Sequence, residues 1–128
     1  MHPSAELKER TKRFAIRIVR LFRSLPKTEE ARVLGRQVLR SGTSLAANYR
    51  AVCRSRSKAE FIAKIGIVVE ETDETVFWLE LLVETSILTE KQLKSLRVEA
   101  NELLAIFAAS QRTARAHTLR SFNDPMSR

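Results

Sequence analysis

The chain has 128 residues, of which 44% are hydrophobic and 30% are charged, with three glycines and three prolines. This composition is typical of a single helical domain and unlike that of a disordered chain or a β-sandwich. Cys53 is the single cysteine, which excludes a disulfide framework and a cysteine metal cluster. No apolar run approaches the length of a membrane span, and the first residues lack the apolar core of a signal peptide, so we expect a cytoplasmic protein.

The net charge of +8 is distributed unevenly along the chain. Residues 1–58 contain 15 Lys and Arg against 4 Asp and Glu, whereas residues 59–109 contain 4 against 10. Residues 110–128 add 4 basic residues against one acidic residue. This segregation predicts either an anionic partner or basic and acidic faces that meet.

Apolar spacing predicts two helices in the basic half. The first carries Leu7, Thr11, Phe14, Ile18, Leu21 and Leu25 at intervals of three and four, and Pro26 ends it. Thr28 is a suitable N-cap for the second helix. Its buried stripe is predicted to contain Val33, Leu34, Val38, Leu45, Tyr49 and Val52. Gly42 lies within this stripe and predicts either a bend or a close approach of a neighbouring helix.

Two capping-box sequences predict the starts of two further helices. Ser57 and Glu60 form the first, and Thr89 and Gln92 form the second. The third helix is predicted to bury Phe61, Ile65, Val68, Val69, Thr72, Val76, Leu79 and Val83, and the fourth to bury Leu93, Leu96, Ala100, Leu103 and Phe107. Short links between long helices predict an all-α, antiparallel up-down-up-down four-helix bundle over residues 1–115, followed by a basic, flexible tail over residues 116–128.

The third helix carries more apolar residues than one bundle core needs. Ile67, Trp78 and Leu82 are predicted to lie to one side of the core arc, and Phe77 nearly opposite it. We therefore expect a homo-oligomer with these four residues at the interface and Trp78 as its anchor. The alternative is that Trp78 closes the core at an edge of the bundle.

A basic stripe runs along the first helix. Arg10, Arg13, Arg17 and Arg20 repeat at intervals of three and four, and Arg50 and Arg54 add charge from the second helix. Arginines one turn apart can follow a phosphate backbone, which predicts nucleic-acid binding with a steep salt dependence. The alternative is that acids of a neighbouring subunit's third helix pair with them, although the cations outnumber those acids.

Catalytic and metal-binding patterns are missing from the sequence. Di-iron bundles need a Glu-x-x-His element on each of two helices, but the only histidines are His2 and His117. The three glycines are isolated, so no phosphate-binding loop is formed. We therefore expect no enzyme activity, no metal and no cofactor.

One segment of the chain resembles a known family. Arg40, Thr43, Ser44, Ala47 and Asn48, followed by Ser57, Glu60 and Phe61, resemble the motif of bacterial four-helix-bundle proteins encoded in intervening sequences of 23S rRNA genes. The resemblance implies a ring-like pentamer, and related proteins include an RNA-associated accessory factor of retroelement reverse transcriptases. Arg50 and Ala51 stand where the family commonly has an acidic residue. For Arg40, Thr43, Ser44 and Asn48 we expect a structural role that ties the second helix to its neighbours.

Two functions of different classes follow from the sequence. The first is a basic, non-enzymatic oligomer that binds nucleic acid, RNA in particular, as an accessory factor. The second is a protein–protein assembly scaffold with no nucleic-acid role.

Overall fold

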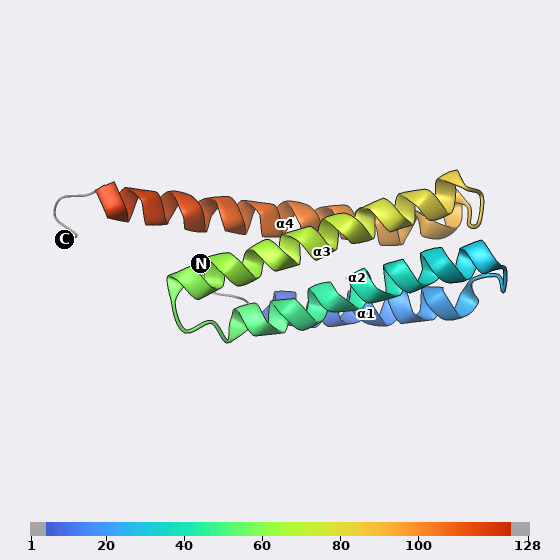
Figure 1. The fold of residues 1–128 in the computed structure, drawn as a ribbon, viewed down its shortest axis with the longest axis horizontal. Helices are drawn as coiled ribbons and strands as arrows, with labels where there is room; N and C mark the ends of the chain where they lie inside the picture. Colours follow the sequence, from blue (N-terminus) through green and yellow to red (C-terminus); the bar gives the residue numbers. More distant parts are fainter. Residues whose placement is uncertain (1–4, 124–128) are drawn as a thin grey trace.

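The computed structural model describes residues 5–123, with side chains to residue 117, and all regular structure in that range is helical. The four helices are α1 (Ala5–Ser24), α2 (Glu29–Cys53), α3 (Lys58–Glu84) and α4 (Glu90–Asn123). Consecutive helices lie side by side, and short connections join them at alternate ends of the molecule (Figure 1). Within the described residues no helix is both long and apolar enough to cross a bilayer.

The helix starts agree with the capping signals in the sequence. The side chain of Thr28 accepts a hydrogen bond from the Ala31 amide at 3.3 Å, and Ser57 accepts one from the Glu60 amide at 3.1 Å. Thr89 and Gln92 form the reciprocal pair, because each side chain accepts the other residue's amide, at 2.8 and 3.1 Å. These bonds satisfy amides that would otherwise lack partners in the first turn.

One hydrophobic core joins all four helices. Phe14 and Ile18 of α1, Tyr49 of α2 and Phe107 of α4 are almost fully buried, and the Tyr49 and Phe107 rings lie 5.3 Å apart. The apolar stripe predicted for α4 is confirmed, since its five residues are all buried. Because these side chains lie in the core, the opposite face of each helix remains at the surface of the protein.

The contact between α1 and α2 depends on small residues of α2. A Cβ atom at Gly42 would come within 2.8 Å of the Ile18 side chain, and one at Gly35 within 2.7 Å of Leu25. Helix α2 is continuous through both glycines. Gly42 therefore serves close approach, the second of its two predicted roles, and α1 packs directly on the α2 backbone.

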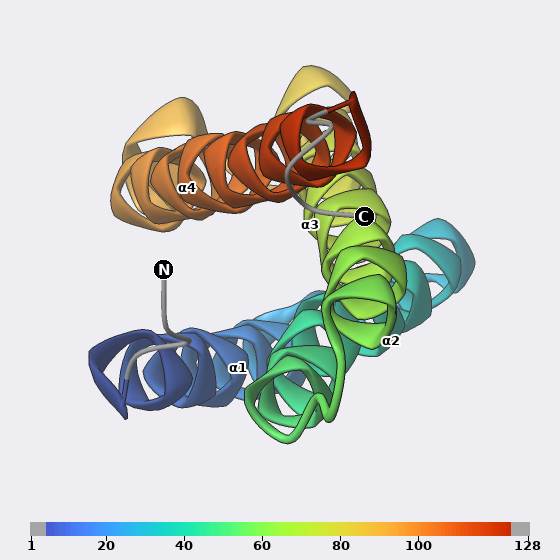
Figure 2. The same ribbon diagram turned by 90° about the vertical axis from the view of Figure 1, so that its left-hand side faces the viewer.

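The third helix packs on α2 through a different set of side chains. Thr75 Oγ1 donates a buried hydrogen bond to Ser41 Oγ at 2.9 Å. Arg40 pairs with Glu71 and Glu74 across the same contact. Helix α2 thus lies between α1 and α3, whereas α1 and α4 make the least extensive helix–helix contact (Figure 2).

Two sequence predictions are wrong in detail. Val33 is 52% exposed, because it lies about 140° around α2 from the buried Val38. Leu82 is completely buried in the subunit, because the core face of α3 is turned toward α2 and includes Thr75. Helix α4 extends to Asn123, so its last residues belong to the predicted tail, and residues 124–128 of that tail lie outside the described residues.

Candidate nucleic-acid interface

The arginine stripe of α1 faces α4. Arg10 donates two hydrogen bonds to the Glu99 carboxylate, both at 2.7 Å, and a third to Glu102 at 2.8 Å. Arg17 donates to Ser95 Oγ at 2.9 Å. These bonds connect α1 to α4 along a polar seam, which we call the Arg10 seam and define as Arg10, Arg17, Ser95, Glu99 and Glu102.

The seam alters the ionisation of its members. Hydrogen bonding to Arg10 lowers the pKa of Glu99 below its ordinary value of 4.5, against the opposing effect of partial burial. The positive charges of Arg17 and Arg13 lower the same pKa further. In turn, the Glu99 hydrogen bond raises the pKa of Arg10. Arg10 is therefore paired with carboxylates of its own chain and is not a free phosphate contact.

The four predicted stripe residues thus divide into two pairs. Arg10 and Arg17 have partners on α4, whereas Arg13 and Arg20 are exposed and have no ion-pair partner among the described side chains. Within the chain, Arg10 pairs with Glu99 and Glu102 of α4. The stripe is therefore only half available to a ligand.

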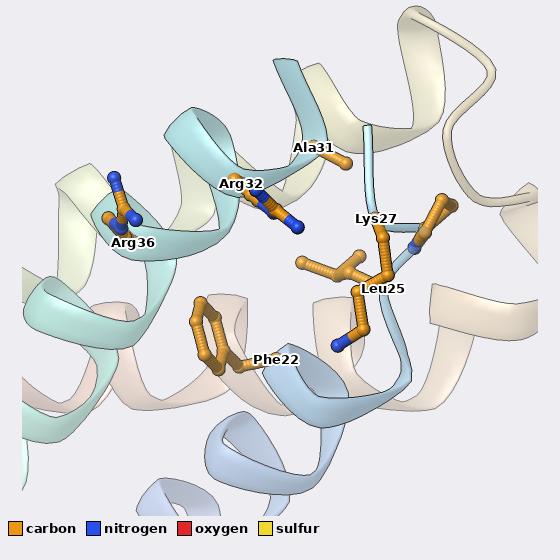
Figure 3. Close-up of a pocket in the computed structure, with 7 residues that line it drawn as sticks. Phe22, Leu25, Lys27, Ala31, Arg32 and Arg36 are labelled. Carbon is orange, nitrogen blue, oxygen red and sulfur yellow. The ribbon is translucent and has the colours of Figure 1, made fainter. Parts of the chain in front are cut away.

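Two hollows lie on the outer side of the α1–α2 hairpin, and cations line both. The first, which we call the turn hollow, has a volume of about 240 Å³ and lies where α1 passes into α2 (Figure 3). It is lined by Phe22, Leu25, Pro26, Lys27, Ala31, Arg32 and Arg36. The second, the alanine hollow, has a volume of about 330 Å³. It is lined by Lys8, Glu9, Lys12, Ala15, Ala46, Ala47 and Arg50.

Helical geometry places the two hollows along one line. Arg32 and Arg50 are 18 residues apart, which is about five full turns of an α-helix, so they project from the same face of α2. Their separation along the helix axis is about 27 Å. Both hollows therefore lie along the same side of the α1–α2 pair, and we call the two together the hairpin groove.

The cations of the hairpin groove form no ion pairs with carboxylates among the described side chains. Lys8, Lys12 and Arg50 at one end, and Lys27, Arg32 and Arg36 at the other, are all exposed. None of the ion pairs formed within the described part of the chain involves any of them. Glu9 is the one acidic residue in the two linings. The predicted site residue Arg50 lies in this groove, and Arg54 is exposed just beyond the end of α2.

The polar motif of α2 acts mostly within its own helix. Asn48 Nδ2 donates to the Ser44 carbonyl and hydroxyl oxygens at 2.8 and 3.1 Å, and Thr43 Oγ1 donates to the Leu39 carbonyl at 2.7 Å. Of the four predicted motif residues, Arg40 alone bonds to another helix, through Glu71 and Glu74. The side-chain hydrogen bonds of Thr43 and Asn48 thus stay within α2, and the expected structural role of Thr43, Ser44 and Asn48 at small-residue contacts between helices stays a prediction.

The predicted interface residues of α3 differ in exposure. Phe77 is 51% exposed and Ile67 is 44% exposed. Trp78 is half-buried, and its ring meets the Phe77 ring edge-on at 4.9 Å. Leu82 lies in the core and is not available to a partner. Phe77, and not Trp78, is the more exposed aromatic of this face.

Sequence reasoning missed several of the residues that matter here. The α4 partners Ser95, Glu99 and Glu102 follow from which helices are neighbours, and no motif marks them. Phe22, Lys8 and Lys12 gain significance only because they meet α2 residues across the groove. Among the described residues no group of three or more His, Cys, Asp and Glu side chains is arranged to hold a metal ion.

Comparison with known proteins places the chain among related sequences. Residues 4–109 match the family described as 23S rRNA-intervening sequence protein. A solved structure of a protein with unknown function from the S23 ribosomal protein family, from Bacteroides thetaiotaomicron VPI-5482, is 36% identical. It matches with a TM-score of 0.76, over 81% of this chain and 96% of that one. No curated protein matches this chain.

The Arg10 seam generates a prediction about stability and pH. Replacing Arg10 with glutamine should lower the free energy of unfolding at pH 7 by about 1 kcal/mol, because a two-pronged charged contact is lost. The Glu99 pKa is lowered in the folded state, so this contribution is present above about pH 4.5 and is lost as the pH falls through the folded-state pKa. Urea denaturation of both proteins at pH 7 and near pH 3 measures this difference.

The matched control is Arg20→Gln, since Arg20 is exposed on the same helix and has no ion-pair partner among the described side chains. Its free energy of unfolding should stay within about 0.5 kcal/mol of the parent. Equal losses for both variants, or a loss for Arg10→Gln that is the same at both pH values, would contradict the seam's role.

Proposed function

Because the chain belongs to the 23S rRNA-intervening sequence protein family, we propose that it is a non-enzymatic cytoplasmic accessory protein that binds nucleic acid, RNA in particular, through the hairpin groove. The observation that carries this proposal is that the exposed cations lining the two ends of the groove have no ion-pair partner among the described side chains. A protein surface that keeps its cations without carboxylate partners is suited to phosphates, since these replace the missing anions.

The distribution of acids supports the same surface. Between residues 5 and 57 the acidic residues are Glu6, Glu9, Glu29 and Glu30, too few for the cations of that segment. The acids of α3 and α4 that form ion pairs with the hairpin hold Arg10 and Arg40. The groove cations lie outside these contacts. Arg13 and Arg20, exposed along α1, extend the positive field beyond the groove.

The chemistry of the groove favours a phosphate backbone over a base-reading role. Its exposed cations are long side chains that reach charged oxygens from many directions. Such contacts release counterions from the nucleic acid, so the affinity falls steeply as salt rises. Binding of this kind depends weakly on base sequence, which suits an accessory protein that covers a length of strand.

We also infer that the antiparallel up-down-up-down bundle assembles into a homo-oligomeric ring. The supporting observation is the exposed apolar surface of α3 around Phe77 and Ile67, which is costly to leave in water. A ring would repeat the hairpin groove on every subunit, and several grooves acting together would bind one strand more tightly than a single groove. If the groove binds no nucleic acid, this apolar face supports the second candidate, an assembly scaffold.

The first prediction tests the groove. A triple variant, Lys12→Gln, Arg36→Gln and Arg50→Gln, should weaken binding to an RNA oligonucleotide. The slope of log affinity against log salt should become shallower by about 2, since each lost contact with a single strand contributes about 0.7. Fluorescence anisotropy of a labelled oligonucleotide between about 50 and 200 mM salt gives both values.

A control variant carries the same change of charge elsewhere. Lys91, Lys94 and Arg112 are exposed on α4 and have no ion-pair partner among the described side chains, so their replacement by glutamine removes three cations outside the groove. This control should keep most of the parent's affinity and slope. Equal losses in the two variants would show that net charge alone acts. A parent protein that ignores RNA at 50 mM salt would favour the scaffold.

The second prediction tests the oligomer. Replacing Phe77 with glutamate places a charge in the exposed apolar face and should reduce the particle mass toward that of one 14.6 kDa chain. Val98→Glu is the matched control, because Val98 is 49% exposed on α4 and lies outside that face. Light scattering compares the three proteins. A monomeric parent, or a Phe77→Glu variant with the parent's mass, would refute the assignment of this face.

A further inference from the structure

The two hollows of the hairpin groove differ in their apolar lining residues. The alanine hollow is floored by Ala15, Ala46 and Ala47, which offer no flat surface to a ligand. The turn hollow contains the ring of Phe22 beside Leu25, with cations at its rim (Figure 3). An aromatic ring next to free cations matches the two parts of a nucleotide, a planar base and a charged phosphate.

Gly35 sets the position of this ring. A Cβ atom at Gly35 would meet Leu25 Cδ1 at 2.7 Å and Phe22 Cδ1 and Cε1 at 3.2 and 3.3 Å. One edge of the Phe22 ring therefore lies close to the α2 backbone, where a Cβ atom at residue 35 would require the ring to move by a few tenths of an ångström. The ring is only partly buried, although it packs against the core. The contact with the α2 backbone restrains one edge of the ring, and the rest of the ring lines the hollow.

Three cations surround the same hollow from two elements. Lys27 comes from the α1–α2 connection, and Arg32 and Arg36 come from consecutive turns of α2 (Figure 3). All three are exposed and lack ion-pair partners among the described side chains. The larger hollow on the other side of the connection, about 520 Å³ between the start of α2 and the end of α3, contains Glu30 and no cation. Among these three hollows, the turn hollow alone combines an aromatic ring with cations.

We propose that the turn hollow accepts one unpaired nucleotide of a single strand, with its base on the Phe22 ring and its phosphates among Lys27, Arg32 and Arg36. This inference rests on the proposed nucleic-acid function and deepens it, because it names the substrate class as single-stranded. A base inside a duplex is stacked on both sides and cannot reach the ring. The strand continues along the groove to the alanine hollow, where Lys8, Lys12 and Arg50 contact its backbone only.

The volume of the hollow fits a single base. At about 240 Å³ it is smaller than the usual site for a drug-sized molecule, which begins near 300 Å³. Stacking on an aromatic ring tolerates every base, because each has a π-face. The turn hollow therefore confers a preference for unpaired strands and little preference among their sequences.

The test uses a uridine-rich RNA 12-mer that carries one 2-aminopurine, a fluorescent base whose emission falls when it stacks. Binding of the parent protein should quench the single strand, whereas the emission of the matched duplex, already low because its bases are stacked, should not change. Phe22→Leu should lose the quenching and weaken single-strand affinity about tenfold, with an unchanged salt slope because the cations remain. Phe22→Tyr keeps an aromatic ring and should retain both properties. Quenching that persists in Phe22→Leu would overturn the proposal.

Two further arms separate the possible failures. If Phe22→Leu does not fold, as judged by circular dichroism, 5-iodouridine cross-linking to the parent protein decides, and a cross-link outside Phe22 and its neighbours would overturn the proposal. Uridine monophosphate should compete only weakly; competition as strong as the 12-mer's would assign the hollow to a free nucleotide. Loss of binding in the Lys12, Arg36 and Arg50 triple variant with no effect of Phe22→Leu would refute the turn hollow alone, whereas a parent that binds no RNA refutes both.

Discussion

The position of α2 between α1 and α3 is the constraint on which the rest of the structure depends. Toward α1 it presents Gly35 and Gly42, so that Leu25 and Ile18 pack against its backbone. Toward α3 it presents Ser41 and Arg40, which bond to side chains of that helix. Because α1 and α3 cover two sides of α2, only the remaining surface of α2 is accessible to a partner. On α2 that surface carries Arg32, Arg36 and Arg50.

The same arrangement decides which charges are neutralised inside the molecule. Carboxylates of α3 and α4 reach the cations that face them, Arg40 and Arg10, and the latter pair connects the first helix to the last. The cations of the hairpin groove form no ion pair with the carboxylates of α3 or α4 among the described side chains and keep their charge unpaired. The segregation of charge along the sequence thus becomes segregation in space. The electrostatic field of the hairpin groove follows from packing, since the core fixes the rotation of each helix.

The sequence allowed prediction of those features that depend on neighbouring positions in the chain. The caps at Thr28, Ser57 and Thr89 and the α4 stripe depend on local spacing, and the structure confirms them. Features that depend on the rotation of one helix against another were not accessible in this way. The apolar pattern of α3 predicts Leu82 at an interface, because the pattern alone does not reveal that α2 covers that side of the helix and buries Leu82.

The candidate site shows the same division. The excess of cations in the first half of the chain was evident in the sequence, but their partners were not. The four arginines of the α1 stripe are evenly spaced. Nothing in that spacing reveals that Arg10 and Arg17 bond to side chains of α4 whereas Arg13 and Arg20 do not. The turn hollow needs Phe22 and Arg36, 14 residues apart, to meet across a helix–helix contact. Pairs of that kind become visible only when the helices are packed.

The measurement that tests the central claim most directly is lysine acetylation footprinting with and without single-stranded RNA, read by mass spectrometry. Lys8, Lys12 and Lys27 line the hairpin groove, whereas Lys91 and Lys94 are exposed on α4, so each protein molecule contains its own control. RNA should protect the three groove lysines and leave the two α4 lysines as reactive as before. Unchanged reactivity of the groove lysines in the presence of bound RNA would contradict the account.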